Sequence, residues 1–131
     1  MKILVTGGAG YIGSHMVKML CGLGHSVVVV DSLVNGYRQA VDKKAKFIEA
    51  CLSSKNIIVK VLKGCDAVMH FAGFSEASIS MQNPGKFLEN NVYYGVLLLE
   101  AMKEAGINNI IFSSTGAVYG NPKYTPIDEN H

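Results

Sequence analysis

The arrangement of apolar segments along the chain constrains its fold more than any other feature. Five short apolar runs, at residues 2–6, 27–30, 46–49, 67–71 and 109–113, are separated by longer segments. Several of these segments carry apolar residues at helical spacing. The connections are too long for hairpins, so we expect parallel strands joined by right-handed crossovers.

The predicted architecture is one α/β domain over residues 1–131, a length typical of a single domain. We expect helices at residues 11–22, 56–63 and 87–105. They suit a doubly wound parallel sheet of the Rossmann type with strand order 3-2-1-4-5. A polar tail with Pro122 and Pro126 follows the fifth strand. We therefore expect the chain to stop in a loop after its fifth strand.

Three glycines, Gly7, Gly10 and Gly13, lie between the first strand and the first helix. Glycine allows the positive φ of a tight turn, and it has no Cβ to hold backbone amides away from a ligand. Those amides and the positive end of the helix dipole suit a diphosphate. A turn without a ligand is the alternative, but the strand before, the helix after and an acid downstream favour a dinucleotide site.

Asp31 ends the second strand, at the distance where dinucleotide-binding βαβ units place an acid. Its carboxylate is able to accept hydrogen bonds from both hydroxyls of an adenosine ribose, and it would repel a 2′-phosphate. No arginine follows, since Ser32 and Leu33 come next. The sequence therefore favours NAD over NADP. An acid that only caps the strand is the alternative.

Charge, hydropathy and cysteine spacing argue against several other functions. A net charge of +2 with interspersed acids offers no basic stripe for nucleic acid. No run approaches the roughly 20 apolar residues of a membrane span, and a signal-peptide core is missing. The three cysteines lack C-x-x-C spacing, and His15 and His70 have no second ligand at metal spacing. We expect a cytoplasmic protein with reduced thiols and no metal, nucleic-acid or membrane partner.

Five ordered motifs span the chain: T-G-G-A-G-Y-I-G-S-H at 6–15, V-V-D-S-L-V-N-G at 29–36, H-F-A-G at 70–73, N-N-V at 90–92 and F-S-S-T-G-A-V-Y-G at 112–120. They resemble the extended short-chain dehydrogenases/reductases, in the NAD-dependent epimerase/dehydratase family. The nearest likeness is to the N-terminal part of members that interconvert UDP-glucose and UDP-galactose by transient oxidation at sugar C4. Related dehydratases carry an Asp-Glu pair where this chain has Gly116 and Ala117, which favours an epimerase.

The resemblance implies one catalytic hydroxyl and a set of cofactor contacts. Thr115 matches the family's catalytic Ser or Thr, and its hydroxyl is able to donate and accept hydrogen bonds. A turn or helix cap is the alternative for this residue. Cys51 stands where the family has an Asp near the adenine, so a lower cofactor affinity is expected. The implied cofactor-binding residues are Gly7, Gly10, Tyr11, Ile12, Gly13, Asp31, Ser32, Leu33, Asn35, Gly36, Cys51, Leu52, Phe71, Ala72, Gly73 and Asn90.

By the same resemblance, the catalytic base is a Tyr with a Lys four residues later on a helix. Tyr119 and Lys123 have this spacing, but Gly120 and Pro122 lie between them and oppose a helix. The resemblance implies that the true pair, the last strands of the sheet and the C-terminal substrate domain lie beyond His131. We therefore expect a sheet that is truncated after its fifth strand, with the substrate domain absent. The chain of 131 residues is therefore predicted to be inactive alone.

Two other functions remain open. A non-catalytic NAD-binding module would be favoured by a stop codon after His131, and the enzyme by a helical Y-x-x-x-K further on. A reductase or decarboxylase acting on another nucleotide sugar would share these motifs. In the full enzyme the expected partner is a UDP-hexose, and the sequence leaves a homodimer open. The fifth strand is rich in Ile110, Ile111 and Phe112, and an unpaired edge there would promote self-association.

Overall fold

The computed structural model describes all residues from 1 to 131. Its strands form one parallel sheet in the order β3-β2-β1-β4-β5, which confirms the predicted topology. Every pair of neighbouring strands is parallel, so each connection crosses over the sheet between two strands, as its length allows. The strands are β1 (Lys2–Thr6), β2 (Ser26–Asp31), β3 (Lys46–Glu49), β4 (Ala67–His70) and β5 (Ile110–Phe112).

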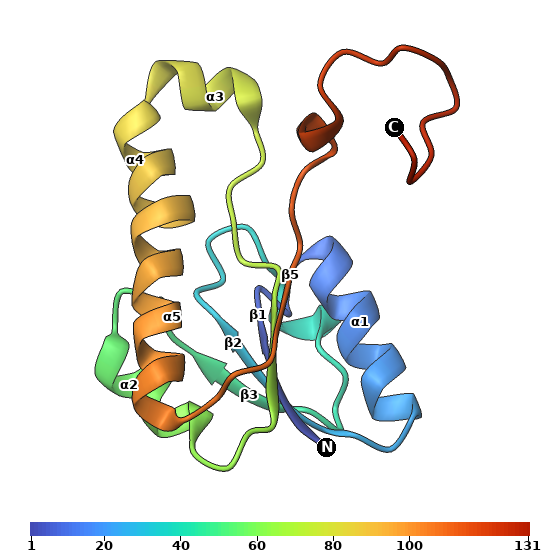
Figure 1. The fold of residues 1–131 in the computed structure, drawn as a ribbon. Coiled ribbons are helices and arrows are strands. Elements are labelled where there is room, and N and C mark those ends of the chain that lie inside the picture. Colours follow the sequence, from blue (N-terminus) through green and yellow to red (C-terminus); the bar gives the residue numbers. More distant parts are fainter.

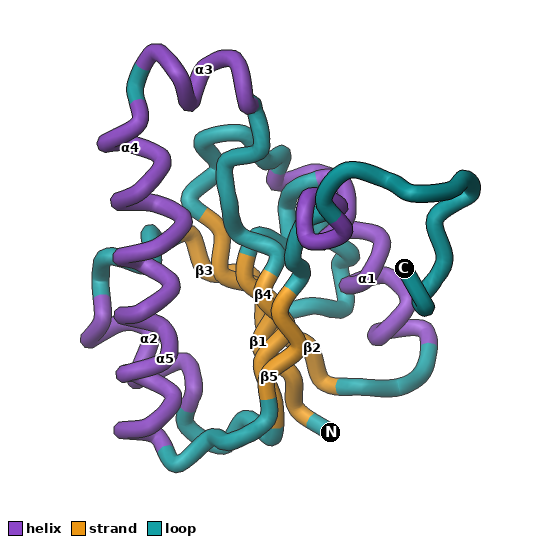
Figure 2. The backbone as a smooth tube through the Cα atoms, turned by 45° about the horizontal axis from the view of Figure 1, so that its top comes forward, coloured by secondary structure: helices purple, strands orange, loops and turns teal.

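Helices cover both faces of the sheet (Figure 1). The helix α1 (Tyr11–Gly22) packs on one face, and α2 (Lys55–Leu62) and α5 (Tyr94–Ala105) pack together on the other. Figure 2 shows the strands between these two groups of helices. None of the helices has the length and apolar character needed to cross a membrane.

The side chains along each strand point alternately to the two faces of the sheet, so the interior consists of two apolar cores. On β1, Val5 contributes to the core under α1, whereas its neighbour Leu4 contributes to the core under α2 and α5. Both side chains are fully buried. Successive strand residues point to opposite faces, so a buried parallel strand needs apolar residues at every position. Burying each such side chain stabilises the fold by about 1.5–3 kcal/mol.

The helical region before α5 differs from the prediction. The expected helix at residues 87–105 begins earlier, as α4 (Pro84–Leu88) and the π-helix η2 (Glu89–Tyr93) continuing into α5. A further helix, α3 (Ala77–Gln82), was not predicted. It buries none of its residues, so it leaves no apolar periodicity in the sequence.

The carboxyl ends of the strands meet at one edge of the sheet, where parallel α/β folds bind ligands. The loops that leave β1, β2 and β4 lie at this edge. Two short 3₁₀ helices complete the structure: η1 (Arg38–Ala40) lies between β2 and β3, and η3 (Gly116–Tyr119) follows β5. The last residues extend away from the sheet as an irregular tail (Figures 1 and 2).

Candidate cofactor site

The glycine turn after β1 is tightly packed against its surroundings. Gly7 has a φ of +70°, and a Cβ added there would lie 2.5 Å from the amide nitrogen of Ala72. A Cβ on Gly13 would collide with the carbonyl oxygen of Gly7, which also accepts a hydrogen bond from the Gly10 amide at 3.1 Å. The absence of side chains therefore lets α1 start directly against β1 and the loop after β4.

The first turn of α1 leaves backbone amides free. Gly10 is the N-cap, no side chain caps the helix, and the first turn contains no acid. The first amide to bond back is that of Ser14, at 3.0 Å from the oxygen of Gly10. The amides of Tyr11, Ile12 and Gly13 have no intrahelical acceptor, as at any helix start. The positive end of the helix dipole is thus open to an anion.

The carboxylate of Asp31 ties the glycine turn to the loop after β2. Its Oδ2 accepts a hydrogen bond from the Ala9 amide at 2.9 Å, and its Oδ1 accepts one from the Leu33 amide at 2.8 Å. Leu33 itself has a φ of 58°. Each carboxylate oxygen accepts more than one hydrogen bond. Asp31 therefore holds the two loops together and keeps acceptor capacity on both oxygens for further donors.

The other residues predicted near the adenosine surround Asp31 or support it from the core. A Cβ on Gly36 would lie 2.9 Å from the Ala9 side chain and 3.0 Å from Asp31 Oδ1, so the loop after β2 packs closely on the glycine turn. The Nδ2 of Asn35 lies 3.5 Å from Glu76 Oε1. The predicted position Leu52 is buried in the core under α2, so its side chain has a packing role. The remaining positions, Ser32 and Cys51, are partly or fully exposed.

The loop after β4 forms the opposite side of the site. The Phe71 amide donates to the Thr6 oxygen at 3.0 Å, which continues the β1–β4 pairing past the end of the strand. The side chains of Phe71 and Ala72 pack against opposite cores. Asn90 lies on η2 and donates from Nδ2 to Asn91 Oδ1 at 2.8 Å. The predicted cofactor residues from β1, β2 and β4 thus gather at one edge of the sheet.

The two histidines singled out in the sequence make hydrogen bonds. His70 is buried, its Nδ1 lies 2.6 Å from Thr6 Oγ1, and its ring stacks on Phe112 at 5.2 Å between centroids. Burial lowers the pKa of His70 below its ordinary value. His15 Nδ1 lies 2.8 Å from the carbonyl oxygen of Tyr11.

Thr115 lies at the start of η3 and caps it. Its Oγ1 accepts a hydrogen bond from the Ala117 amide at 3.2 Å, which is the capping role weighed as the alternative. The hydroxyl proton remains available to a ligand. No helix joins Tyr119 to Lys123, because η3 ends at Tyr119 and Gly120 adopts a φ of +66°. The structure confirms that this Y-x-x-x-K spacing is not helical.

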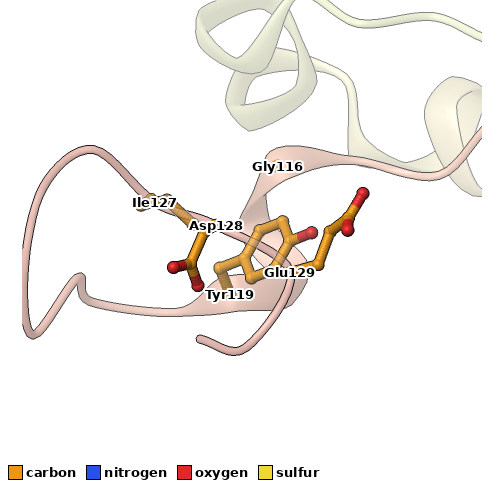
Figure 3. A pocket seen from close by; sticks show the side chains of 5 residues that line it. All are labelled: Gly116, Tyr119, Ile127, Asp128 and Glu129. Atoms are coloured by element: carbon orange, nitrogen blue, oxygen red, sulfur yellow. The ribbon is translucent and has the colours of Figure 1, made fainter.

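The tail encloses an open hollow of about 550 Å³ that is separate from the glycine turn (Figure 3). Its walls carry the acids Asp128 and Glu129 beside the ring of Tyr119. Asp128 Oδ1 already accepts hydrogen bonds from the Tyr124 hydroxyl and the Asn130 amide, both at 2.9 Å. Two carboxylates would repel a diphosphate, so this hollow is not the cofactor site. No group of His, Cys, Asp and Glu side chains is arranged to hold a metal, and the three cysteines are free.

The chain belongs to the NAD dependent epimerase/dehydratase family, whose model matches residues 3–131. Its curated relatives include the UDP-glucose 4-epimerases of Lacticaseibacillus casei, 47% identical, and of Streptococcus mutans, 49% identical. Each match covers 98% of this chain and 40% of the relative. These matches confirm the resemblance found in the motifs. The chain therefore spans about two-fifths of the length of the relatives it matches.

Solved structures support the same relationship. A crystal structure of a UDP-glucose 4-epimerase superposes with a TM-score of 0.92 at 45% identity, covering 99% of this chain and 40% of that one. The Brucella ovis UDP-glucose 4-epimerase in complex with NAD gives a TM-score of 0.91 at 38% identity, covering 98% of this chain and 40% of that one. At 38–45% identity, these proteins resemble this chain in sequence as well as in fold.

Two parts of the site were not predicted from the sequence. The Ala9 amide is the partner of Asp31, and backbone groups leave no residue-type signal. Asn91 hydrogen-bonds to both backbone groups of Phe74, although only its neighbour Asn90 was predicted to matter. The paired asparagines were visible in the sequence, but the π-helix that decides which way each one points was not.

Proposed function

We propose that these residues form the cofactor-binding part of an NAD-dependent epimerase that interconverts UDP-glucose and UDP-galactose. The observation that carries the proposal is the uncapped start of α1 beside Asp31. Free amides suit the diphosphate, and a carboxylate one strand away suits a ribose without a 2′-phosphate. The identity to UDP-glucose 4-epimerases supports the choice of substrate class.

The residues of the site fit such a cofactor. The first turn of α1 has no acid to repel a diphosphate, and Gly7 and Gly13 bring the turn close to the strand. Tyr11 and Ile12 are exposed beside the free amides, so they are able to border a bound diphosphate. The glycine turn and Asp31 would hold NAD, which would supply reversible hydride transfer at the sugar C4. Thr115 would hydrogen-bond the C4 hydroxyl and orient it.

Titration calorimetry with NAD and with NADP tests the proposal. We expect the chain to bind NAD more tightly than NADP, because Asp31 repels a 2′-phosphate. Replacing Asp31 by Ser should weaken NAD binding and reduce the preference over NADP. The control is Asp66→Ser, which removes an acid at the opposite end of the sheet, where it accepts from the Lys2 amide. Equal affinities of the unaltered chain for both cofactors would overturn the proposal.

A non-catalytic NAD-binding module is the second candidate. It would use the same glycine turn and Asp31 to hold NAD. A reductase or decarboxylase acting on another nucleotide sugar would also use this cofactor site. A cytoplasmic location and a homodimer stay predictions from the sequence. Cofactor binding without turnover by the complete gene product would favour the module.

A further inference from the structure

We propose that Asn91 is a positioning residue that holds one wall of the cofactor site in place. The inference rests on the proposed function, because the wall is the loop after β4. This loop, from Phe71 to Phe74, lies between the glycine turn and η2 (Figure 1). Asn91 does not itself have to contact the cofactor.

The amide side chain of Asn91 binds Phe74 at two points. Its Oδ1 accepts a hydrogen bond from the Phe74 amide at 2.8 Å, and its Nδ2 donates to the Phe74 oxygen at 2.8 Å. The side chain thereby mimics the pairing of a neighbouring β-strand. Both groups are partly buried, so an unpaired one would carry a desolvation cost.

The same side chain also orients Asn90. Its Oδ1 accepts a second hydrogen bond, from Asn90 Nδ2, at 2.8 Å. This leaves the Oδ1 of Asn90 as a free acceptor on the residue predicted to reach the cofactor. Both asparagines lie in η2, where the i→i+5 pattern adds a residue to the helical turn.

The loop held by Asn91 rests directly on the glycine turn. A Cβ on Gly7 would lie 2.5 Å from the Ala72 nitrogen and 2.6 Å from the Phe71 carbonyl carbon. The ring of Phe74 is also anchored on α4, at 5.4 Å from the Phe87 ring and 5.1 Å below the Lys86 ammonium. A shift of this loop would therefore change the space next to the turn that receives the diphosphate.

The substitution Asn91→Asp tests the proposal with little change in size. At neutral pH the introduced carboxylate keeps both accepted hydrogen bonds, but it places an anionic oxygen against the Phe74 carbonyl. We expect about tenfold weaker NAD binding, from one lost hydrogen bond and one unpaired carbonyl. At acidic pH a protonated carboxyl group donates again. The affinity relative to the unaltered chain should then recover as the pH falls from about 5.5 toward about 3.5, around the ordinary pKa of about 3.9 of an aspartate carboxyl group.

Two further variants separate positioning from general damage. Asn83→Asp makes the same chemical change at the N-cap of α4, where Asn83 Oδ1 accepts from the Lys86 amide at 3.3 Å, and NAD affinity should not change. Asn91→Ala should weaken binding at every pH without recovery. At each pH the affinity of the variant is divided by that of the unaltered chain. This ratio cancels the effects of ionisable groups that both proteins share, such as Glu76 and Glu89.

The outcomes distinguish this inference from the function on which it rests. If the unaltered chain binds NAD and Asn91→Asp binds it equally well, the positioning role is overturned. If Asn91→Asp binds NAD more weakly and its affinity does not recover at acidic pH, the role of the Asn91 hydrogen bonds is overturned. If the unaltered chain does not bind NAD, the proposed function fails. Hydrogen exchange at the Phe74 amide then still tests the contact, because Asn91→Ala should accelerate it about tenfold.

Discussion

Single residues without side chains decide how closely the parts of the cofactor site approach. Gly7 combines a positive φ with direct contact to the loop after β4. We expect Gly7→Ala to destabilise the fold by about 3 kcal/mol, from left-handed backbone strain plus a collision with backbone atoms. NAD binding should be lost even below the unfolding temperature. Thermal unfolding and calorimetry measure the two effects.

Gly24 provides the matched control for Gly7. It has a φ of +81°, but a Cβ there meets nothing within 4 Å. Gly24→Ala should therefore cost only the backbone strain, about 1–2 kcal/mol, and leave NAD affinity unchanged. Equal losses in the two variants would show that the contact with Ala72 is not important.

His70 makes the stability of the fold depend on pH. Burial lowers its pKa in the folded state, so the unfolded chain binds the proton more readily. Its contribution is complete above the unfolded pKa of about 6.5 and is lost as the pH falls toward the lower folded value. The free energy of unfolding should decrease by up to about 1.4 kcal/mol per pH unit in this window. Chemical denaturation between pH 5 and 7.5 measures the slope.

Replacing His70 by Gln should remove this part of the slope, because the amide takes up no proton. The exposed His15 provides the matched variant, His15→Gln, measured over the same pH range. The comparison uses slopes, since His70→Gln also alters the contact with Thr6 and changes the stability at every pH. An unchanged slope in His70→Gln would contradict the assignment.

At the scale of elements, strands and well-packed helices were predictable because burial on one or two faces leaves a period in the sequence. The order of the strands followed from crossover rules and the glycine turn. The short helix α3 left no such pattern, since Ile79 and Met81 are exposed. The π-helix η2 was hidden for another reason, because one extra residue per turn does not change the local composition.

The edge strand β5 presents an exposed apolar surface. It pairs only with β4, and Ile111 and Phe112 are 59% and 57% exposed. We expect the chain to self-associate through this edge, and Ile111→Lys to reduce the association because a charge blocks edge pairing. Light scattering over a range of concentrations measures the apparent mass. A monodisperse monomer for the unaltered chain would contradict the expectation.

A second exposed apolar row lies on the helices before and within α5, so the association needs a control. The row contains Leu88, Val92, Val96 and Leu99 at helical spacing. Leu99→Lys places the same charge on this row and should leave an association through β5 unchanged. If Leu99→Lys abolishes self-association and Ile111→Lys does not, the association occurs through the helices instead.

At the scale of the whole molecule, the proposed cofactor site is assembled from three loops, and the proposed epimerisation needs a general base in addition. The site gathers residues that follow β1, β2 and β4, but no helical Tyr and Lys pair faces it. We expect residues 1–131 alone to show no appreciable turnover of UDP-galactose, because general base catalysis contributes roughly 10²- to 10⁴-fold. A coupled assay with added NAD measures it. Turnover at a rate typical of an enzyme would falsify this expectation.

The double attachment of Asp31 limits how the cofactor preference of this fold can be re-engineered. An arginine at that position would offer charge to a 2′-phosphate, but it would also strip the Ala9 and Leu33 amides of their acceptor. A successful NADP variant would therefore need a replacement acceptor for each of the two amides, introduced together with the cation. Single-site libraries at Asp31 should yield weak binders of both dinucleotides rather than a switch.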